Sequence, residues 1–332
     1  MLRIRDAIRA DAGAIARLEH ESALVRDDGS RVRLLRGASL FDQLELMGDA
    51  RLFVAEDDGA VVACEAASVH DVRVGGAARR LLYRHHVRVL PGHRRRGLNA
   101  AFSERVLDFA RAARADGGYV YVDPHNALVR EWQSSPSGAR TWRSAPAWSV
   151  APVRALLRCD ALAGQVAGRP ASTADAGRIA ALVNACHARE EMFLPCDQTR
   201  LSRRLGRFPA AYGWKDVWID GDAAVGVWNA RERCLREAAD GALSESTRAF
   251  VLDYGLDPQR GLADFERLLR AWCRHLAGEG VTHLSIFTSP GSPGEAVIRG
   301  LVESTAELRL HSSVAEPADV AGRGVFVDHL HF

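Results

Sequence analysis

The feature that most constrains the fold of this chain is an internal repeat at a constant offset of 164 residues. Three segments align without gaps at this offset: residues 10–18 (ADAGAIARL) with 174–182 (ADAGRIAAL), residues 51–63 with 215–227, and residues 96–98 (RGL) with 260–262. Three agreeing segments are hard to obtain by chance, so we infer a tandem duplication. We expect two domains, a first copy at residues 1–163 and a second copy at residues 164–332, joined by the linker 164–170 (GQVAGRP).

Both copies predict the same order of elements. In the first copy, residues 51–69 predict a β-hairpin. Two apolar runs flank Asp58-Gly59, a dipeptide that is typical of hairpin turns. Residues 79–90 then predict a strand, and residues 98–115 carry apolar side chains at helical spacing. We therefore expect an α/β fold with a mixed (α+β) sheet in each copy, in which a glycine turn joins a central strand to the main helix.

Composition excludes several classes of protein. The chain of 332 residues is 47% hydrophobic, yet no run reaches the roughly 18 apolar residues that span a membrane. Its first residues, MLRIRDAIRAD, lack the apolar core of a secretory signal. The six cysteines form no CxxC pair, which argues against a metal site and a disulfide framework. With a net charge of +2, we expect a cytoplasmic protein without metal, membrane or nucleic-acid partners.

The segment 87–102 (VRVLPGHRRRGLNAAF) combines the features of an anion site. The free N–H groups at a helix start and the helix dipole favour negative charge, and Gly97 lets the backbone approach a ligand closely. Arg94, Arg95 and Arg96 can add forked donors. However, Lys215 is the only lysine among 44 basic residues, so an arginine cluster is unsurprising in this chain. Spacing alone leaves a pyrophosphate site and an ordinary charged turn both open.

The same segment resembles the acyl-CoA-binding motif of the GNAT superfamily of N-acetyltransferases. The pattern V-x-V-x-P-x-x-R-x-x-G-x-x-A runs from Val87 to Ala100, and the order of elements in both copies also resembles this fold. The resemblance implies that acetyl-CoA, or another acyl-CoA, is the co-substrate. Asn99 stands where the family usually has Gly or Ala. The implied cofactor-binding residues are Val87, Arg88, Val89, Arg94, Arg95, Arg96, Gly97, Leu98, Asn99, Ala100 and, after the next strand, Asn126.

The second copy lacks these anion-binding features. At the constant offset, Pro258 stands at the position of Arg94, and Asp264 at that of Ala100. A carboxylate in the first helical turn repels a pyrophosphate, and proline offers neither a charge nor an N–H group. We therefore expect one CoA site, in the first copy, and a degenerate second copy.

Attack of an amine on a thioester requires a base, and a strand of the first copy carries candidates. Strict alternation would place Tyr83, His85, Val87 and Val89 on one face. Because some family members use an acid or a histidine on this strand, His85 is the preferred base. Tyr83 and Glu65 are the other catalytic candidates.

The candidate general acid is undetermined. Family members often carry a tyrosine seven residues after the matched asparagine, but that position is Gln133 here, beside Trp132. Tyr119 and Tyr121 lie on the adjacent predicted strand, where a role in the core is the alternative.

The leading hypothesis is an acyl-CoA-dependent N-acyltransferase that acts by direct transfer in a ternary complex. A small-molecule amine is the expected acceptor, and residues 19–48 occupy the place of the family's acceptor-binding helices. The second copy could also mediate a homodimer. Two alternatives stay open: a non-catalytic module that senses acyl-CoA or acts as a scaffold, and an aminoacyl-tRNA-dependent transferase whose binding would depend strongly on salt.

Overall fold

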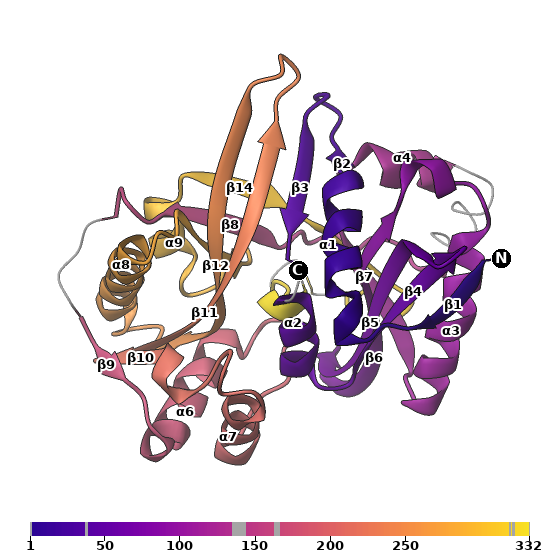
Figure 1. The fold of residues 1–332 in the computed structure, drawn as a ribbon. Helices are drawn as coiled ribbons and strands as arrows, with labels where there is room; N and C mark the ends of the chain where they lie inside the picture. The colour runs from indigo at the N-terminus through magenta and orange to yellow at the C-terminus, as the bar shows by residue number, and fades with distance from the viewer. Residues whose placement is uncertain are drawn as a thin grey trace.

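The computed structural model describes residues 2–36, 39–134, 144–162, 167–318, 320 and 323–331. Two mixed sheets lie side by side, with helices packed on them, and the C-terminus ends between the two (Figure 1). Among the helices of these residues, none is both long and apolar enough to cross a membrane.

The first copy contributes these elements in chain order: β1 (Arg3–Asp6), α1 (Ala12–Glu21), β2 (Leu24–Val25), β3 (Arg31–Leu35), α2 (Ser39–Met47), β4 (Ala50–Asp57), β5 (Ala60–Val74), β6 (Ala77–Val89), the 3-10 turn η2 (Pro91–His93), α3 (Leu98–Ala112), β7 (Gly117–Val122), α4 (Ala127–Ser134) and β8 (Val153–Arg158). The predicted turn of the β4–β5 hairpin lies at Asp58 and Gly59, both of which have positive φ. This backbone twist matches that of the flanking strands.

The second copy repeats the order: β9 (Arg169–Pro170), α6 (Ala176–His187), α7 (Gln198–Arg207), β10 (Val217–Asp220), β11 (Ala223–Glu237), β12 (Leu243–Leu256), α8 (Leu262–Gly278), β13 (His283–Thr288), α9 (Glu295–Leu301), β14 (Ser304–Glu307), β15 (Arg309–Ser312) and the 3-10 turn η6 (His329–His331). The main helices α3 and α8 begin 164 residues apart, as the repeat requires. The predicted succession of hairpin, strand, helix and strand is therefore present in both copies.

The two sheets have matching strand orders and exchange their last strands. The first sheet runs β1-β4-β5-β6-β7-β15, and the second contains the run β9-β10-β11-β12-β13-β8-β14. Thus β8, from the first copy, pairs with β13, whereas β15, from the second copy, pairs with β7. Strand β3 also crosses over and pairs with β11. The predicted boundary at residues 163 and 164 lies outside the described residues, and these three strands cross it in space.

In each sheet, the two central parallel strands separate after three paired residues. Strand β6 pairs with β7 only from Leu81 to Tyr83, so its residues 84–89 run on without this neighbour. Strands β12 and β13 pair only from Arg248 to Phe250. This separation exposes backbone hydrogen-bonding groups at the strand edges, and such groups must find another partner.

A bulge in β6 reverses the alternation of its side chains between the two faces of the sheet. The register against β5 shifts between Cys64 and Ala66, and His86 in β6 has a positive φ of 52°. Before the bulge, His85 pairs with Ala66, which packs with α1 and α2. After the bulge, Val89 packs with α3 on the opposite face. The expectation that His85 and Val89 share one face is therefore wrong, because an extra residue breaks the alternation.

Candidate functional site

The turn between β6 and α3 forms a backbone cradle. Arg95 and Gly97 both have positive φ, 63° and 77°, which is a conformation that turns successive N–H groups toward one point. Arg94 N donates to Pro91 O (3.3 Å), and Ala100 N donates to Gly97 O (3.0 Å). Within the described residues, the N–H groups of residues 95–99 have no such acceptor. This cradle at a helix N-terminus suits an anion such as a pyrophosphate.

The three arginines of the turn differ in their ion-pair partners. Arg96 pairs with Asp57 (3.0 Å), which also lies 3.5 Å from His93, while Arg95 pairs with Glu131 of α4. For the half-buried Arg94, the described part of the chain offers no ion-pair partner. The side chain of Leu98 packs in the α3 core, so only its backbone can face a ligand.

The equivalent turn of the second copy is filled by its own side chain. Asp257 Oδ1 accepts hydrogen bonds from Gln259 N (2.9 Å) and Arg260 N (3.1 Å), and its carbonyl oxygen accepts one from Gly261 N (2.8 Å). These donors correspond, at the offset of 164, to the N–H groups of residues 95–97 in the first copy. These hydrogen bonds lower the pKa of the Asp257 carboxyl. The second copy therefore holds a carboxylate where the first copy offers open donors.

The strand separation of the second copy is also occupied. His329, from the C-terminal segment, lies between β12 and β13: its Nδ1 bonds to Val251 O (2.7 Å) and its Nε2 to Ser285 Oγ (3.1 Å). At the constant offset, Val251 corresponds to Val87 of the first copy. Val87 is 48% exposed, and its carbonyl oxygen accepts a local bond from the Arg88 guanidinium (3.0 Å). The strand edge that the GNAT resemblance implies for the cofactor is thus exposed at Val87 in the first copy, whereas His329 occupies the equivalent position in the second.

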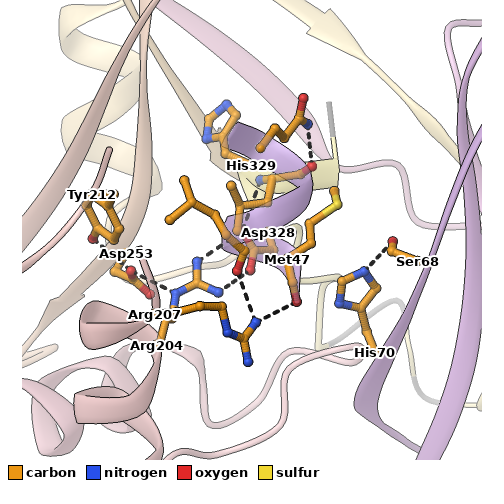
Figure 2. A network of polar contacts seen from close by, with 12 residues as sticks. Met47, Ser68, His70, Arg204, Arg207, Tyr212, Asp253, Asp328 and His329 are labelled. Atoms are coloured by element: carbon orange, nitrogen blue, oxygen red, sulfur yellow. Dashed lines mark hydrogen bonds and ion pairs between the residues drawn. The ribbon is translucent and has the colours of Figure 1, made fainter. Parts of the chain in front are cut away.

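The C-terminal segment that carries His329 is held by a network of polar contacts that joins both copies (Figure 2). Arg204 of α7 binds Asp253 (3.0 Å) and Asp328 (2.7 Å), and Tyr212 donates to the same Asp253 (2.8 Å). Arg207, one turn further along α7, donates to the carbonyl oxygen of Met47 at the end of α2 (2.7 Å). These contacts fix the C-terminal segment against the second sheet and anchor α2 beside it.

Three buried or half-buried histidines near this interface predict acid sensitivity. Burial lowers the pKa of His70 and of His86 to about 4, and that of His329 to about 3. Between pH 6.5 and 4 the unfolded chain binds protons that the folded chain excludes, so stability rises with pH. As the pH is lowered through this window, we expect the free energy of unfolding to fall by up to ~4 kcal/mol per pH unit.

Urea unfolding at pH 7.5, 6.5, 5.5 and 4.5 measures this slope. The variant His329→Gln should reduce the slope by about one third, since one of three contributing groups is removed. The exposed His20→Gln is the control and should leave the slope unchanged. A flat profile over this range would show that these histidines titrate normally.

The catalytic candidates of β6 lie beside the strand separation. The ring of His85 stacks on that of Tyr83 (4.9 Å between centroids, 8° between planes), and Tyr83 in turn stacks on Tyr119 (5.0 Å). Burial raises the pKa of Tyr83, which makes its phenol a poor source of protons. His85 therefore sits on an aromatic platform, and its assignment as the base stays a prediction.

Glu65 lies on the other face of the sheet from His85. It pairs across the sheet with Phe53, which packs with α3, and its Oε1 accepts from Arg84 Nε (2.6 Å). The side chain is completely buried, and Oε2 has no hydrogen-bond partner among the described residues. This position does not favour Glu65 as a base for a reaction on the His85 side.

Asn126 caps the N-terminus of α4. Its Oδ1 accepts from the N–H groups of Leu128 (3.1 Å) and Val129 (3.3 Å), which caps the helix. The same helix carries Gln133, half-buried, where the family often has a tyrosine. The side chain of Trp132 lies outside the described residues.

A buried polar chain, which sequence reasoning missed, links the two copies next to the bulge. His86 Nε2 lies 3.1 Å from Glu19 Oε1, and its Nδ1 lies 2.9 Å from Arg36 Nη1. Since the guanidinium can only donate, Nδ1 accepts and Nε2 carries the proton, which agrees with the lowered pKa of His86. Arg36 Nε also contacts Glu232 Oε2 of β11 (2.6 Å). The available signal was the presence of charged residues inside apolar segments.

Residues 18–132 match the model of the acetyltransferase (GNAT) family. This segment is a GNAT domain. The match runs from α1 to α4 and therefore includes both the backbone cradle and the separation of β6 from β7. A search of curated proteins found no match in sequence.

Solved structures extend the GNAT fold over both copies. N-myristoyltransferase from Saccharomyces cerevisiae, solved with bound myristoyl-CoA, aligns with a TM-score of 0.65 at 10% identity, covering 98% of this chain and 89% of that chain. A GCN5-related N-acetyltransferase from Sphaerobacter thermophilus aligns with a TM-score of 0.51 at 18% identity, covering 95% of this chain and 96% of that chain. The predicted fold class, an α/β tandem duplication of the GNAT fold, is confirmed.

Proposed function

We propose that this protein transfers the acyl group of acetyl-CoA, or of another acyl-CoA, to the amino group of a small molecule. The observation that carries this proposal is the contrast between the two turns. The first copy offers open N–H groups at residues 95–99, whereas Asp257 consumes the equivalent donors in the second. A cradle without an internal occupant, in a GNAT domain, fits the pyrophosphate of one CoA per chain.

The strand separation supplies the second half of the site. The pantetheine arm would lie against β6 near Val87, which is 48% exposed. This route leads the thioester to the bulge and to the aromatic platform of His85. Asn126, at the start of α4, is proposed as a further amide contact to the cofactor through its side-chain nitrogen, since its Oδ1 caps the helix.

The chemistry requires one base and no covalent intermediate. The amine nitrogen bonds to the thioester carbon, the C–S bond breaks, CoA leaves as its thiolate, and the ammonium proton passes to the base. We propose His85 for this role rather than His86, because the Nδ1 lone pair of His86 already accepts from Arg36. The leaving thiolate takes its proton from water, since burial raises the pKa of Tyr83.

Calorimetric titration of acetyl-CoA into the full chain tests the proposal. We expect micromolar binding with a stoichiometry of one, followed by release of free CoA thiol when a panel of primary amines is added. A stoichiometry of two would contradict the account of the second turn. Binding without thiol release for any amine would favour a module that senses acyl-CoA, and absence of binding would refute the proposed function.

A further inference from the structure

Two arginines of the second sheet face the first copy without carboxylate partners of their own. Arg248 of β12 stands directly opposite Glu232 of β11, and Arg154 of β8 stands opposite Phe287 of β13. Because Phe250 pairs with Ser285 in the same sheet, alternation places Arg248, Phe250, Phe287 and Arg154 on one face. The His329 ring packs on this face, 4.3 Å from the ring of Phe287.

Within the described residues, neither guanidinium has an ion-pair partner, and the Nε atom of each is buried without a hydrogen bond. Burial, and next the charge of Arg248, lower the pKa of Arg154 to about 10. Both side chains are half-buried, and a guanidinium whose Nε atom has neither water nor a hydrogen-bond acceptor is destabilising, so an anion bound here would stabilise the two arginines.

The neighbouring carboxylates are committed to other groups. Glu232 is bound by Arg36 (2.6 Å), and Asp123, at the end of β7, is bound by Arg26 (3.1 Å). Arg88 of β6, after the bulge, adds another positive charge, which the charges of Glu19 and Glu232 influence. The cluster of Arg36, Arg88, Arg154, Arg248, Glu19 and Glu232, here called the interface cluster, therefore carries four cations and two carboxylates.

The interface cluster combines residues from both copies. Its members come from α1, the segment after β3, β6, β8, β11 and β12, so it faces both the β6 bulge and the end of β7. An acyl chain that emerges between β6 and β7 would meet this region first.

We propose that the acceptor amine carries an anionic group, a carboxylate or a phosphate, and that Arg154 and Arg248 bind it. This inference rests on the proposed acyltransfer, in which the first copy binds the acyl-CoA. The second copy then acts as the acceptor-binding half of the site, although it binds no CoA itself. Guanidinium groups suit both anions, because their forked donors match paired oxygens.

The test compares matched amines that differ in the anionic group. With CoA at saturation, so that the cradle is filled, β-alanine is titrated against β-alaninamide, and 2-aminoethyl phosphate against ethanolamine. We expect the acidic member of at least one pair to bind about 10- to 100-fold more tightly, as for a charge-assisted hydrogen bond. A preference within the first pair identifies a carboxylate, and one within the second a phosphate. Equal affinities within both pairs would overturn the inference.

Variants of Arg154 and Arg248 test whether these residues cause the preference for an anionic amine. Arg154→Gln and Arg248→Gln should each abolish it, whereas Arg158→Gln, an exposed arginine on the same strand as Arg154, should retain it. Preference that survives in both variants would overturn the assignment to these residues.

A stability measurement does not depend on the identity of the acceptor. Because Arg154 lacks a partner, Arg154→Met should leave the thermal midpoint of the unliganded chain unchanged or raised. A lowered midpoint would show that the fold itself satisfies this guanidinium, which would overturn the inference. Failure of acetyl-CoA to bind the wild-type chain would instead refute the proposed function, and the amine comparison can then be repeated without CoA.

Discussion

Ala100→Asp is expected to weaken acetyl-CoA binding about 100-fold while leaving the chain folded. Ala100 is exposed in the first turn of α3, three residues beyond Gly97. A carboxylate there would face the pyrophosphate, and two like charges about 5 Å apart near a protein surface repel by ~3 kcal/mol, or about 100-fold in affinity. The same carboxylate stabilises an empty helix N-terminus by ~0.3–1 kcal/mol, so the midpoint of thermal unfolding should hold or rise.

Calorimetry of acetyl-CoA with this variant, beside circular dichroism, separates the two effects. Leu107→Asp adds the same charge to an exposed position in the middle of the same helix and should bind as the wild type does. The second copy already carries Asp264 at the corresponding position, where it accepts a hydrogen bond from Asp222 N (2.6 Å). Unchanged binding by Ala100→Asp would place the cofactor elsewhere in the molecule.

Arg36→Met is expected to destabilise the chain by about 3–5 kcal/mol. The substitution would leave Glu232, which is 2% exposed, as a buried carboxylate without its 2.6 Å partner. It would also remove the donor to His86 Nδ1. Because Arg36 comes from the first copy and Glu232 from the second, the loss weakens the contact between the copies. Chemical denaturation with urea measures the change in free energy of unfolding.

A second substitution shows whether the unpaired charge of Glu232 causes the loss of stability. Arg36→Met combined with Glu232→Gln should recover at least half of the lost stability, because the buried charge is removed. Arg233→Met is the matched control on β11: its pair with Glu245 is exposed, so we expect a change of ~0.5 kcal/mol or less. A double variant as unstable as Arg36→Met alone would show that packing, not charge, holds this contact.

Prediction from the sequence succeeded where the signal is local. The repeat at a fixed offset, the hairpin at Asp58-Gly59 and the helix that follows Gly97 each depend on residues close together in the chain. Prediction failed at His85 and Val89, because a single bulge residue, His86, reverses the alternation and leaves no trace in composition.

The sequence by itself determined the duplication, the order of elements and the contrast between Ala100 and Asp264, because these follow from periodicity and from residue type at aligned positions. Only the tertiary structure decided which groups meet across the copies. The exchange of β8 and β15, the position of His329 between β12 and β13, and the Arg36–Glu232 contact join residues far apart in the chain. Such contacts arise from the association of the two copies, which balances burial against charge over the whole molecule and which no local pattern encodes.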